Sequence, residues 1–210
     1  MYYLLYRTFL LNGEVSKIKN LVGSVEFKPK KPLADIEQIR PDDIKAEALF
    51  QKIESHNLDA MFAMCIDVYL PERLIELPRL GTFLWHEGIT PEYRGVYSPF
   101  WALSNADYEN LGYTLLRMNH KLDAGDIYLQ GKAENIDAFE DWHSYIGHKA
   151  VLDSLPSAQG LLEAMATDSH TPLNRSNAED AYYSYPTASK LLKLAIKRRY
   201  AKSFGKAKVG

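Results

Sequence analysis

The segment from Gly81 to Gly131 constrains the fold of this 210-residue chain more than any other stretch. It alternates short apolar runs with polar loops that contain glycine and proline, a pattern typical of buried strands joined by loops that carry chemistry. One apolar run, residues 83–85, stops at His86 and Glu87, so two titratable side chains follow a predicted buried strand. Because ligands of open α/β sheets bind beyond the carboxyl ends of the strands, this pair is a candidate for chemistry.

Predicted strands and helices alternate along the middle of the chain. Short, bounded apolar runs indicate buried central strands, and apolar residues at helical spacing or a proline in the first turn indicate helices. The strands are predicted at residues 61–66, up to His86, at 111–118 and at 126–130, and the helices at 42–56, at 71–77 and from Ser98. This alternation predicts an α/β domain with a doubly wound, mostly parallel sheet and helices on both faces.

Both ends of the chain differ from its middle. Residues 1–12 are apolar nearly all round and predict a buried helix, and residues 15–22 predict a second short helix. Residues 24–27 alternate in polarity and could form a strand. A further helical region begins at Ala138 and is expected to break at Pro156.

Positive charge is concentrated at the C-terminus. The chain has 25 Lys or Arg and 27 Asp or Glu, and the segment from Lys190 onward is basic without a single acidic residue. We expect a domain of residues 1–180 followed by a basic helical extension of residues 181–210. The extension is expected to be a solvated helix, with contact to nucleic acid as the alternative.

Cysteine and histidine usage gives no sign of a metal site. The single Cys65 excludes an intramolecular disulfide and a cysteine-based zinc site, and a buried thiol is expected in its apolar run. His143 and His148 are five residues apart and do not stack on one helix face, so both are predicted at the surface, as is His120. No apolar run reaches the ~18 to 20 residues that span a bilayer, and the N-terminus lacks the features of a signal peptide. Cytoplasmic residence fits these features best.

The spacing of polar residues after the predicted strand resembles that of a known family. His86 is followed by Pro91 after four residues, then by Tyr-Arg-Gly at 93–95, by Gly112 at the start of a strand, and by Leu-Asp-Ala-Gly at 122–125. Order and separation resemble the signature of the folate-dependent formyltransferases, a group that includes glycinamide ribonucleotide, methionyl-tRNA and sugar-nucleotide N-formyltransferases. The resemblance implies a formyltransferase-type, Rossmann-like fold.

The chain also departs from the family signature, although the resemblance covers about residues 58–135. The family's asparagine two residues before the histidine is Leu84, which shares a strand face with His86 because strand side chains alternate. A further histidine of the family corresponds to Leu116, and the Pro-Ser after the histidine has become Glu-Gly at 87–88. An opening strand, glycine-rich turn and helix are not recognisable, so the N-terminal part is atypical or shortened.

The resemblance implies catalytic roles for His86 and Asp123. A histidine can donate to the developing oxyanion or protonate the departing folate nitrogen, and a carboxylate can raise the pKa of that histidine and order a water. Glu87 could be a substitute base, a counter-charge to the substrate amine, or an exposed loop acid. Tyr93 and Arg94 are candidates for substrate binding, with Arg94 suited either to an anionic group or to tying the loop to backbone carbonyls.

The family binds 10-formyltetrahydrofolate as formyl donor, and in it the loop after the strand at 61–66 encloses the pterin ring. A plain connection between strand and helix is the alternative for this loop. The residues expected to bind the donor are Cys65, Ile66, Asp67, Val68, Tyr69, Leu70, Leu122 and Ala124.

The implied function is transfer of a formyl group from 10-formyltetrahydrofolate to an amine of a small molecule or nucleotide-linked sugar. Two alternatives remain open. With Leu84 at the carboxamide position, the protein could hydrolyse its substrate or transfer a different acyl group. The atypical N-terminal part favours the other alternative, a catalytically inactive protein that binds a folate or a partner.

Overall fold

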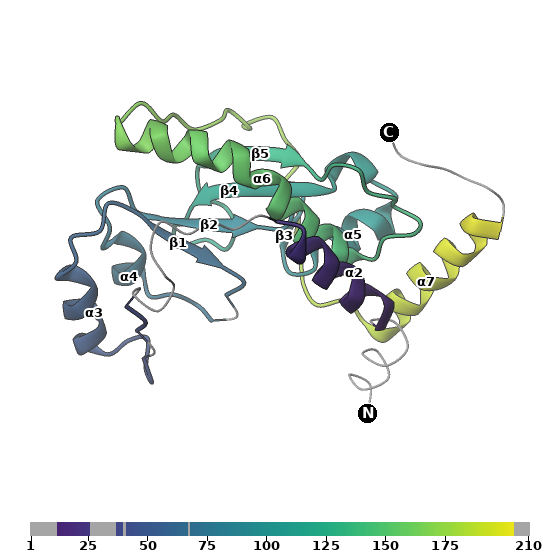
Figure 1. Cartoon of the computed structure of the whole chain (residues 1–210), viewed down its shortest axis with the longest axis horizontal. Helices are drawn as coiled ribbons and strands as arrows, with labels where there is room; N and C mark the ends of the chain where they lie inside the picture. Colours follow the sequence, from purple (N-terminus) through teal and green to yellow (C-terminus); the bar gives the residue numbers. More distant parts are fainter. Residues whose placement is uncertain (1–11, 26–36, 40, 67, 204–210) are drawn as a thin grey trace.

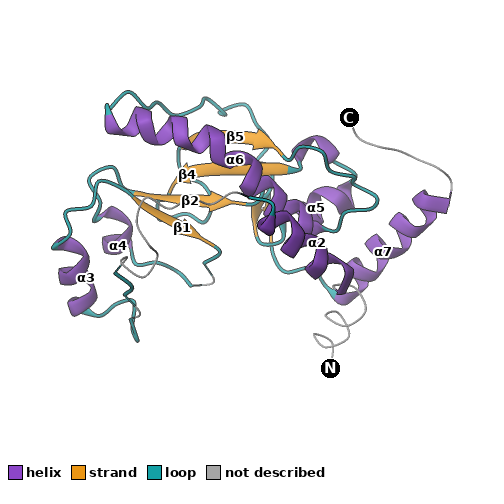
Figure 2. Cartoon of the chain, viewed as in Figure 1, coloured by secondary structure: helices purple, strands orange, loops and turns teal. Residues whose placement is uncertain are grey.

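The computed structural model of the protein describes residues 12–25, 37–39, 41–66 and 68–203. The helix expected over residues 1–12, except for its last residue, and half of the possible strand at 24–27 lie outside the described residues. The elements, shown in Figures 1 and 2, are α2 (Asn12–Gly23), α3 (Glu47–Glu54), β1 (Met61–Met64), α4 (Glu72–Glu76), β2 (Thr82–His86), β3 (Arg94–Gly95), α5 (Ser98–Asn105), the 3₁₀ turn η2 (Tyr108–Asn110), β4 (Gly112–Arg117), β5 (Ile127–Lys132), α6 (His143–Ala166), β6 (Tyr182–Tyr183) and α7 (Ala188–Ser203).

A four-stranded sheet in the order β1-β2-β4-β5 forms the centre of the fold, and β3 pairs with β6 in a separate two-stranded sheet. The predicted α/β class is confirmed. Strand direction differs from the expectation on one side, because β1 and β2 are parallel whereas β4 is antiparallel to both β2 and β5. The loop of residues 118–126 joins β4 to β5 without a helix, so the chain returns as a hairpin and not through a crossover connection.

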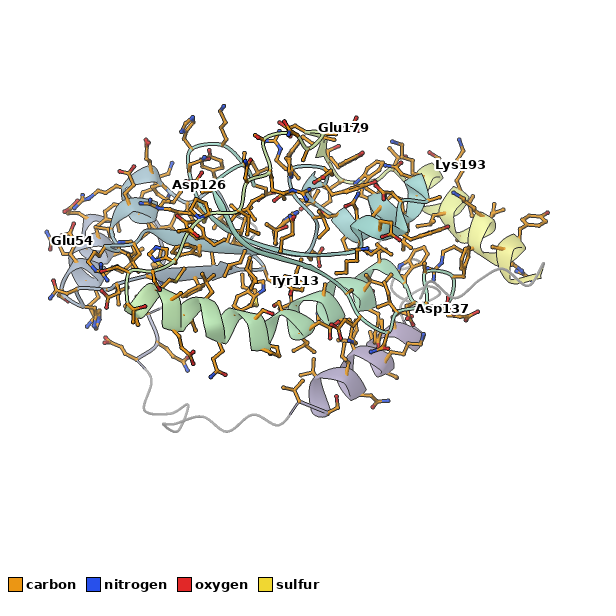
Figure 3. All side chains as sticks on the ribbon, turned by 90° about the horizontal axis from the view of Figure 1, so that it is seen from above. Glu54, Tyr113, Asp126, Asp137, Glu179 and Lys193 are labelled. Carbon is orange, nitrogen blue, oxygen red and sulfur yellow. The ribbon has the colours of Figure 1, made fainter. Side chains whose placement is uncertain are left out.

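Alternate residues of β2 face opposite sides of the sheet. Phe83 and Trp85 face α6, where Trp85 Nε1 donates a hydrogen bond of 2.8 Å to Ser154 Oγ. Thr82 points the other way, and its hydroxyl donates to the Ile75 carbonyl oxygen in α4 at 2.8 Å. Figure 3 shows α6, in green, lying along one face of the sheet. Helices therefore cover both faces, as predicted.

The main apolar cluster lies between β4, α5, α6 and α7, and its fully buried members include Phe100 and Ile146. Leu191 and Leu194 of α7 belong to it, with exposed fractions of 7% and 3%. Lys190 Nζ lies 4.2 Å from the centre of the Trp101 ring. The predicted helix in the C-terminal segment is confirmed, but the expectation that it is simply solvated is wrong, because one face of α7 packs into the core. The division into domains at residue 180 stays a prediction.

The strand predicted at residues 61–66 is shorter and lies elsewhere in the sheet than expected. Among the described strands β1 is at the edge, and Phe62 and Met64 are exposed. It ends at Met64 because Cys65 adopts a left-handed backbone with φ of 51°. Cys65 is exposed, so the expectation of a buried thiol is wrong. A continuous apolar run does not distinguish a central strand from an edge strand that borders a cavity.

Two predicted helices have different bounds. α3 begins after Ala46 rather than at Asp42, because Asp43 Oδ1 accepts a hydrogen bond from the Lys45 backbone N–H and holds the preceding residues in a turn. α6 runs through Pro156 without the expected break. Buried contacts on both sides of the proline, at Ala150 and Ala158, hold the helix in one piece.

Burial corrects one further prediction. His143, expected at the surface, is buried at 5% exposure on the inner side of α6, against the rings of Tyr97 and Phe100. Burial lowers the pKa of its imidazole to about 3, with Arg198 as a smaller cause. His120 and His148 are exposed, as predicted. Within the described residues, no helix is long and apolar enough to cross a membrane.

Candidate active site

A cavity of about 490 Å³ opens at the carboxyl ends of β1 and β2. This is the edge of the sheet at which the sequence predicted the chemistry. The lining comes from residues 64–66, 68–70, 75, 84–87, 95–97, 116, 118, 119, 121–123, 151 and 185.

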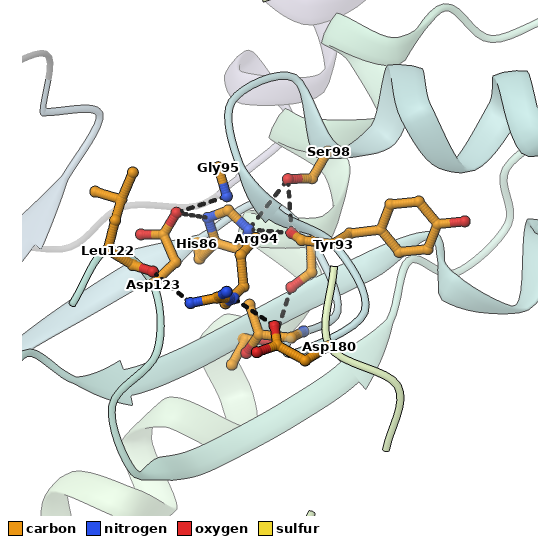
Figure 4. Close-up of polar contacts among 11 residues, drawn as sticks. His86, Tyr93, Arg94, Gly95, Ser98, Leu122, Asp123 and Asp180 are labelled. Atoms are coloured by element: carbon orange, nitrogen blue, oxygen red, sulfur yellow. Dashed lines mark hydrogen bonds and ion pairs between the residues drawn. The ribbon is translucent and has the colours of Figure 1, made fainter. Parts of the chain in front are cut away.

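His86 ends β2 and is held by its Nε2 atom (Figure 4). Nε2 lies 2.8 Å from the carbonyl oxygen of Tyr93 and 3.1 Å from Ser98 Oγ, and the Ser98 hydroxyl donates to the same carbonyl at 3.0 Å. A carbonyl oxygen only accepts hydrogen bonds, so Nε2 carries a proton. The other ring nitrogen, Nδ1, lies 3.9 Å from Asp123 Oδ2. Nδ1 is therefore the nitrogen available for proton transfer.

The Asp123 carboxylate is fixed beside this nitrogen. Asp123 is buried at 8% exposure, has a left-handed φ of 49°, and accepts a hydrogen bond of 2.8 Å from the Gly95 backbone N–H. Gly95 itself has a φ of 98°, and a Cβ there would come within 2.0 Å of the Tyr183 carbonyl oxygen. Only glycine fits this position, and it allows the loop to approach closely enough to hold the carboxylate.

Arg94 ties the site's loops together. Its Nε forms an ion pair of 2.7 Å with Asp180 Oδ1, and its Nη1 donates to the Leu122 carbonyl oxygen at 3.3 Å (Figure 4). The Tyr93 hydroxyl donates to Asp107 at 2.8 Å, and burial raises the pKa of Tyr93. Neither side chain belongs to the cavity lining. Of the two roles considered for Arg94, this geometry favours the loop-tying one.

Most of the residues predicted to bind the donor line one wall of the cavity. The exposed apolar side chains of Ile66, Val68 and Leu122 lie at its mouth. The Tyr69 hydroxyl donates to the His120 carbonyl oxygen at 2.6 Å, which joins the two loops. The predicted set divides as follows: Cys65, Ile66, Val68, Tyr69, Leu70 and Leu122 line the cavity, Ala124 does not, and Asp67 lies outside the described residues.

Two of the positions at which the chain departs from the family signature meet in space. Leu84 and Leu116 are direct partners in the antiparallel register of β2 and β4, and both line the cavity. They pack in one cluster with Ala63 and Ile127. The cavity floor beside His86 is therefore apolar.

Glu87 lies on the other side of the strand end, facing α6. The space that a Cβ would occupy at Gly147 is taken by a Glu87 carboxylate oxygen, at 2.2 Å. Burial raises the pKa of the Glu87 carboxyl to about 7. The third predicted catalytic side chain thus borders the same cavity as His86 and Asp123 but from the α6 side.

Sequence reasoning missed the roles of Ser98 and Tyr97. The predicted helix does begin at Ser98, but Tyr97 is its N-cap, with a left-handed φ of 61°, and the Ser98 hydroxyl contacts His86. The Ser-Pro pair after the Tyr-Arg-Gly loop is the signal in the sequence. Left-handed residues cluster in the lining at Cys65, Gly95, Tyr97 and Asp123, as strained backbone does at functional sites.

Comparison with known proteins gives the family. A family model described as Formyl transferase matches residues 9–150. The methionyl-tRNA formyltransferase of Bacteroides thetaiotaomicron is 29% identical over 139 residues, which are 62% of this chain and 42% of the relative. That of Macrococcus caseolyticus is 28% identical over 158 residues, 71% of this chain and 49% of the relative. The chain thus spans about half the length of the curated relatives it matches.

Solved structures show the same fold. A sugar N-formyltransferase from Shewanella sp FDAARGOS_354 has a TM-score of 0.56 and 16% identity, over 72% of this chain and 64% of that one. The formyltransferase PseJ from Anoxybacillus kamchatkensis, solved with tetrahydrofolate, has a TM-score of 0.55 and 12% identity, over 87% of this chain and 86% of that one. At such identities the likeness concerns the fold alone. With the family model matched over most of the chain, the chain belongs to the formyl transferase family.

Proposed function

We propose that the protein transfers a formyl group from 10-formyltetrahydrofolate to the amine of a small molecule or nucleotide-linked sugar. One observation carries the proposal: His86 Nδ1 and Asp123 Oδ2 lie 3.9 Å apart, both buried, in a cavity at the ends of the strands. A histidine and a carboxylate so placed can pass a proton between the atoms of a reacting pair.

The residues of the cavity fit a folate donor. A volume of about 490 Å³ lies in the range of small-molecule sites. Exposed apolar side chains, among them Ile66, Val68 and Leu122, offer contacts for an aromatic ring, and two polar residues, His86 and Asp123, converge at the inner end. The donor would supply the formyl group as a co-substrate.

The chain's own contribution is proton transfer at Nδ1. Because Nε2 keeps its proton against the Tyr93 carbonyl oxygen, neutral His86 presents Nδ1 as an acceptor. It accepts the proton that the attacking nitrogen releases, and Asp123 stabilises the imidazolium. The same proton then passes to the folate nitrogen as its bond to the formyl carbon breaks.

The apolar floor favours one second candidate, binding of a folate without transfer. Leu84 and Leu116 provide no hydrogen-bond donor toward a developing oxyanion. A preorganised donor at such a place contributes about 10² to 10³ in rate. A protein with this floor would transfer slowly or would only bind the folate.

The proposal also includes the kind of acceptor and the cellular compartment. The named relatives include enzymes for methionyl-tRNA and for sugars, and we favour a small-molecule amine because one face of α7, the basic helix, packs into the core. Contact between its exposed basic residues and nucleic acid is the alternative. Cytoplasmic residence is supported by the use of a single cysteine, Cys65, which is free.

Ligand binding and turnover test the proposal separately. Tetrahydrofolate and its 10-formyl form should each raise the melting temperature saturably, since a ligand at ~100 times Kd adds about 2.7 kcal/mol. Single-turnover assays with 10-formyltetrahydrofolate and D-glucosamine, glycine or methylamine would then detect transfer. Stabilisation without transfer would favour the binding protein, and the absence of any stabilisation would remove both candidates.

A further inference from the structure

Glu87 occupies an unusual place for a glutamate. Its side chain is packed among protein atoms, and it lines the cavity beside Trp85, Tyr97 and Val151. Its carboxylate has no hydrogen-bond or ion-pair partner among the described residues. A buried carboxylate without a partner is costly, so it gains most from a ligand that brings a positive charge or a hydrogen-bond donor.

The neighbouring helix makes room for this carboxylate. At Gly147 of α6, an added Cβ would lie 2.2 Å from Glu87 Oε2 and 3.0 Å from its Cδ. Any larger residue at 147 would force the carboxyl out of this position. At the second glycine of α6, Gly160, no atom of the described residues lies within 4 Å of an added Cβ. Gly147 is thus fitted to the glutamate, whereas Gly160 is not fitted to any neighbour.

We propose that Glu87, seated against Gly147, is the subsite that binds the protonated amine of the acceptor and removes its first proton. The inference rests on the proposed function and deepens it, because it assigns the acceptor to the α6 side of the cavity. His86 and Asp123 hold the reacting centre from the opposite side of the strand end. Adjacent residues of an extended chain point to opposite faces, which places the two functions around one cavity.

The charges around Glu87 are compatible with this role. The ionisable side chains that line the cavity with it are Cys65, Tyr69, His86, Tyr97, Lys121 and Asp123, with Tyr185 at the rim. On α6 the ionisable side chains within one turn of Gly147 are His143, Tyr145, His148 and Lys149, of which His143 is buried and His148 is exposed. Burial alone raises the pKa of the Glu87 carboxyl to about 7, with no charged neighbour contributing. A base works best when its pKa is near the working pH.

The protons and bonds balance in this scheme. The acceptor binds as an ammonium and gives one proton to the Glu87 carboxylate, which frees the nitrogen lone pair. A bond then forms between this nitrogen and the formyl carbon, and the bond from that carbon to the folate nitrogen breaks. His86 takes the second proton from the acceptor nitrogen and passes it to the folate nitrogen. Glu87 releases its proton to solvent, so the net products are the formamide, tetrahydrofolate and one proton.

A titration of Glu87 tests the subsite without any turnover. In protein labelled with ¹³C-glutamate, the carboxyl signal assigned through Glu87→Gln should titrate with a midpoint near 7. Methylammonium chloride should lower the midpoint, because a bound cation favours the ionised carboxyl. Tetramethylammonium chloride at equal ionic strength is the control, since it has no N–H to donate. An equal response to both salts, or an unshifted midpoint, would overturn the proposal.

Two glycine variants test whether Gly147 makes the room that the Glu87 carboxyl occupies. Gly147→Ala leaves Glu87 chemically intact but fills its position, so the response to methylammonium should be lost. Gly160→Ala is the matched control on the same helix and should keep that response. Alanine is the better helix former at both sites, and both variants should remain folded in urea titrations. A wild-type response in Gly147→Ala would show that the glycine does not seat the carboxyl in a subsite.

Measurements of turnover test the Glu87 subsite and the proposed formyl transfer independently of each other. With an acceptor that turns over, Glu87→Gln should lower kcat/KM by about 10² to 10⁴ and remove a limb near neutral pH from the profile. The exposed Glu76→Gln is the control and should match the wild type. Wild-type kcat/KM and pH profile in Glu87→Gln would overturn the subsite while formyl transfer stands. A selective methylammonium response in a protein that transfers no formyl group would remove the function while the cation subsite stands.

Discussion

A backbone carbonyl sets the protonation of His86. The Tyr93 carbonyl oxygen accepts from both Nε2 and the Ser98 hydroxyl, so three groups share one short network. Nδ1 is left to face Asp123 and the cavity. Ser98, which is not part of the cavity lining, thereby positions His86, the residue that we propose to act on the substrate.

Ser98→Ala should therefore change the chemistry more than the fold. Loss of one hydrogen bond that orients the ring is worth about 0.5 to 1.5 kcal/mol, which corresponds to a fall in kcat of about 2- to 10-fold. The pH profile should shift as well, because the environment of the imidazole changes, while KM for the folate stays constant. Ser104→Ala in the same helix is the control, because the Ser104 hydroxyl has no hydrogen-bond partner among the described residues. An unchanged pH profile would reduce Ser98 to a structural role.

The apolar floor of the cavity leads to a second prediction about single residues. Leu84→Asn should raise formyl transfer if the protein is a weakened transferase, by up to about 10² to 10³, because it restores a donor on the face of His86. Leu116 lies directly opposite, so an unpartnered amide would cost about 1 to 3 kcal/mol of stability. Adding Leu116→His should increase the gain beyond the sum of the single changes.

Leu84→Ala is the control for the floor, since it makes space without a donor and should give no gain in single-turnover rate. If the wild type turns over well and Leu84→Asn loses nearly all turnover, the leucine is a specialised part of a different chemistry.

Among the elements, α7 shows how a basic segment can belong to the core. Its lysines and arginines lie mostly outside, whereas Leu191 and Leu194 join the cluster formed by α5 and α6. Trp101 of α5 adds a hydrogen bond from Nε1 to the Ser184 carbonyl oxygen at 3.0 Å, just before this helix. Removing the chain after Tyr185 should therefore expose the main cluster.

Leu194→Ala tests this packing without truncation. The buried leucine should cost about 2 to 5 kcal/mol of unfolding free energy. Leu192 of the same helix is 61% exposed, and Leu192→Ala should change stability by no more than ~0.5 kcal/mol. Urea unfolding of the two variants gives the comparison. Equal, small losses would show that α7 is the separate extension that composition alone predicts.

Across the whole molecule, the spacing of the family motifs indicated which residues share the cavity, whereas it did not indicate the strand directions. His86 is the last residue of β2 and Asp123 lies in the loop between β4 and β5. Because β4 is antiparallel to β2, the two residues meet through the course of this loop and not because two carboxyl strand ends lie at one edge. Strand direction at β4 and β5, the edge position of β1 and the burial of His143 depend on contacts between distant segments. No window of the sequence contains such contacts, because apolar runs and helical spacing report only which residues avoid water.

Two side chains with shifted pKa values, His143 and Glu87, should have opposite effects on how the stability of the protein changes with pH. The pKa of His143 is lowered from its ordinary 6.5 to about 3, so below 6.5 only the unfolded chain binds that proton and stability rises with pH. The pKa of Glu87 is raised from 4.5 to about 7, so above 4.5 only the folded chain keeps that proton and stability falls with pH. In the shared window, from 4.5 to 6.5, the two contributions cancel.

In single variants, where only one of the two contributions remains, the free energy of unfolding should therefore change with pH more steeply than in the wild type. Relative to the wild type, Glu87→Gln should gain stability as pH rises through this window, and His143→Phe should lose it, each by at most about 1.4 kcal/mol per pH unit. Phenylalanine keeps the aromatic contacts with Tyr97 and Phe100. Urea unfolding at several pH values measures the slopes, with the exposed His148→Gln as control. Variant curves parallel to that of the wild type would mean that neither group keeps its unusual protonation in the folded protein.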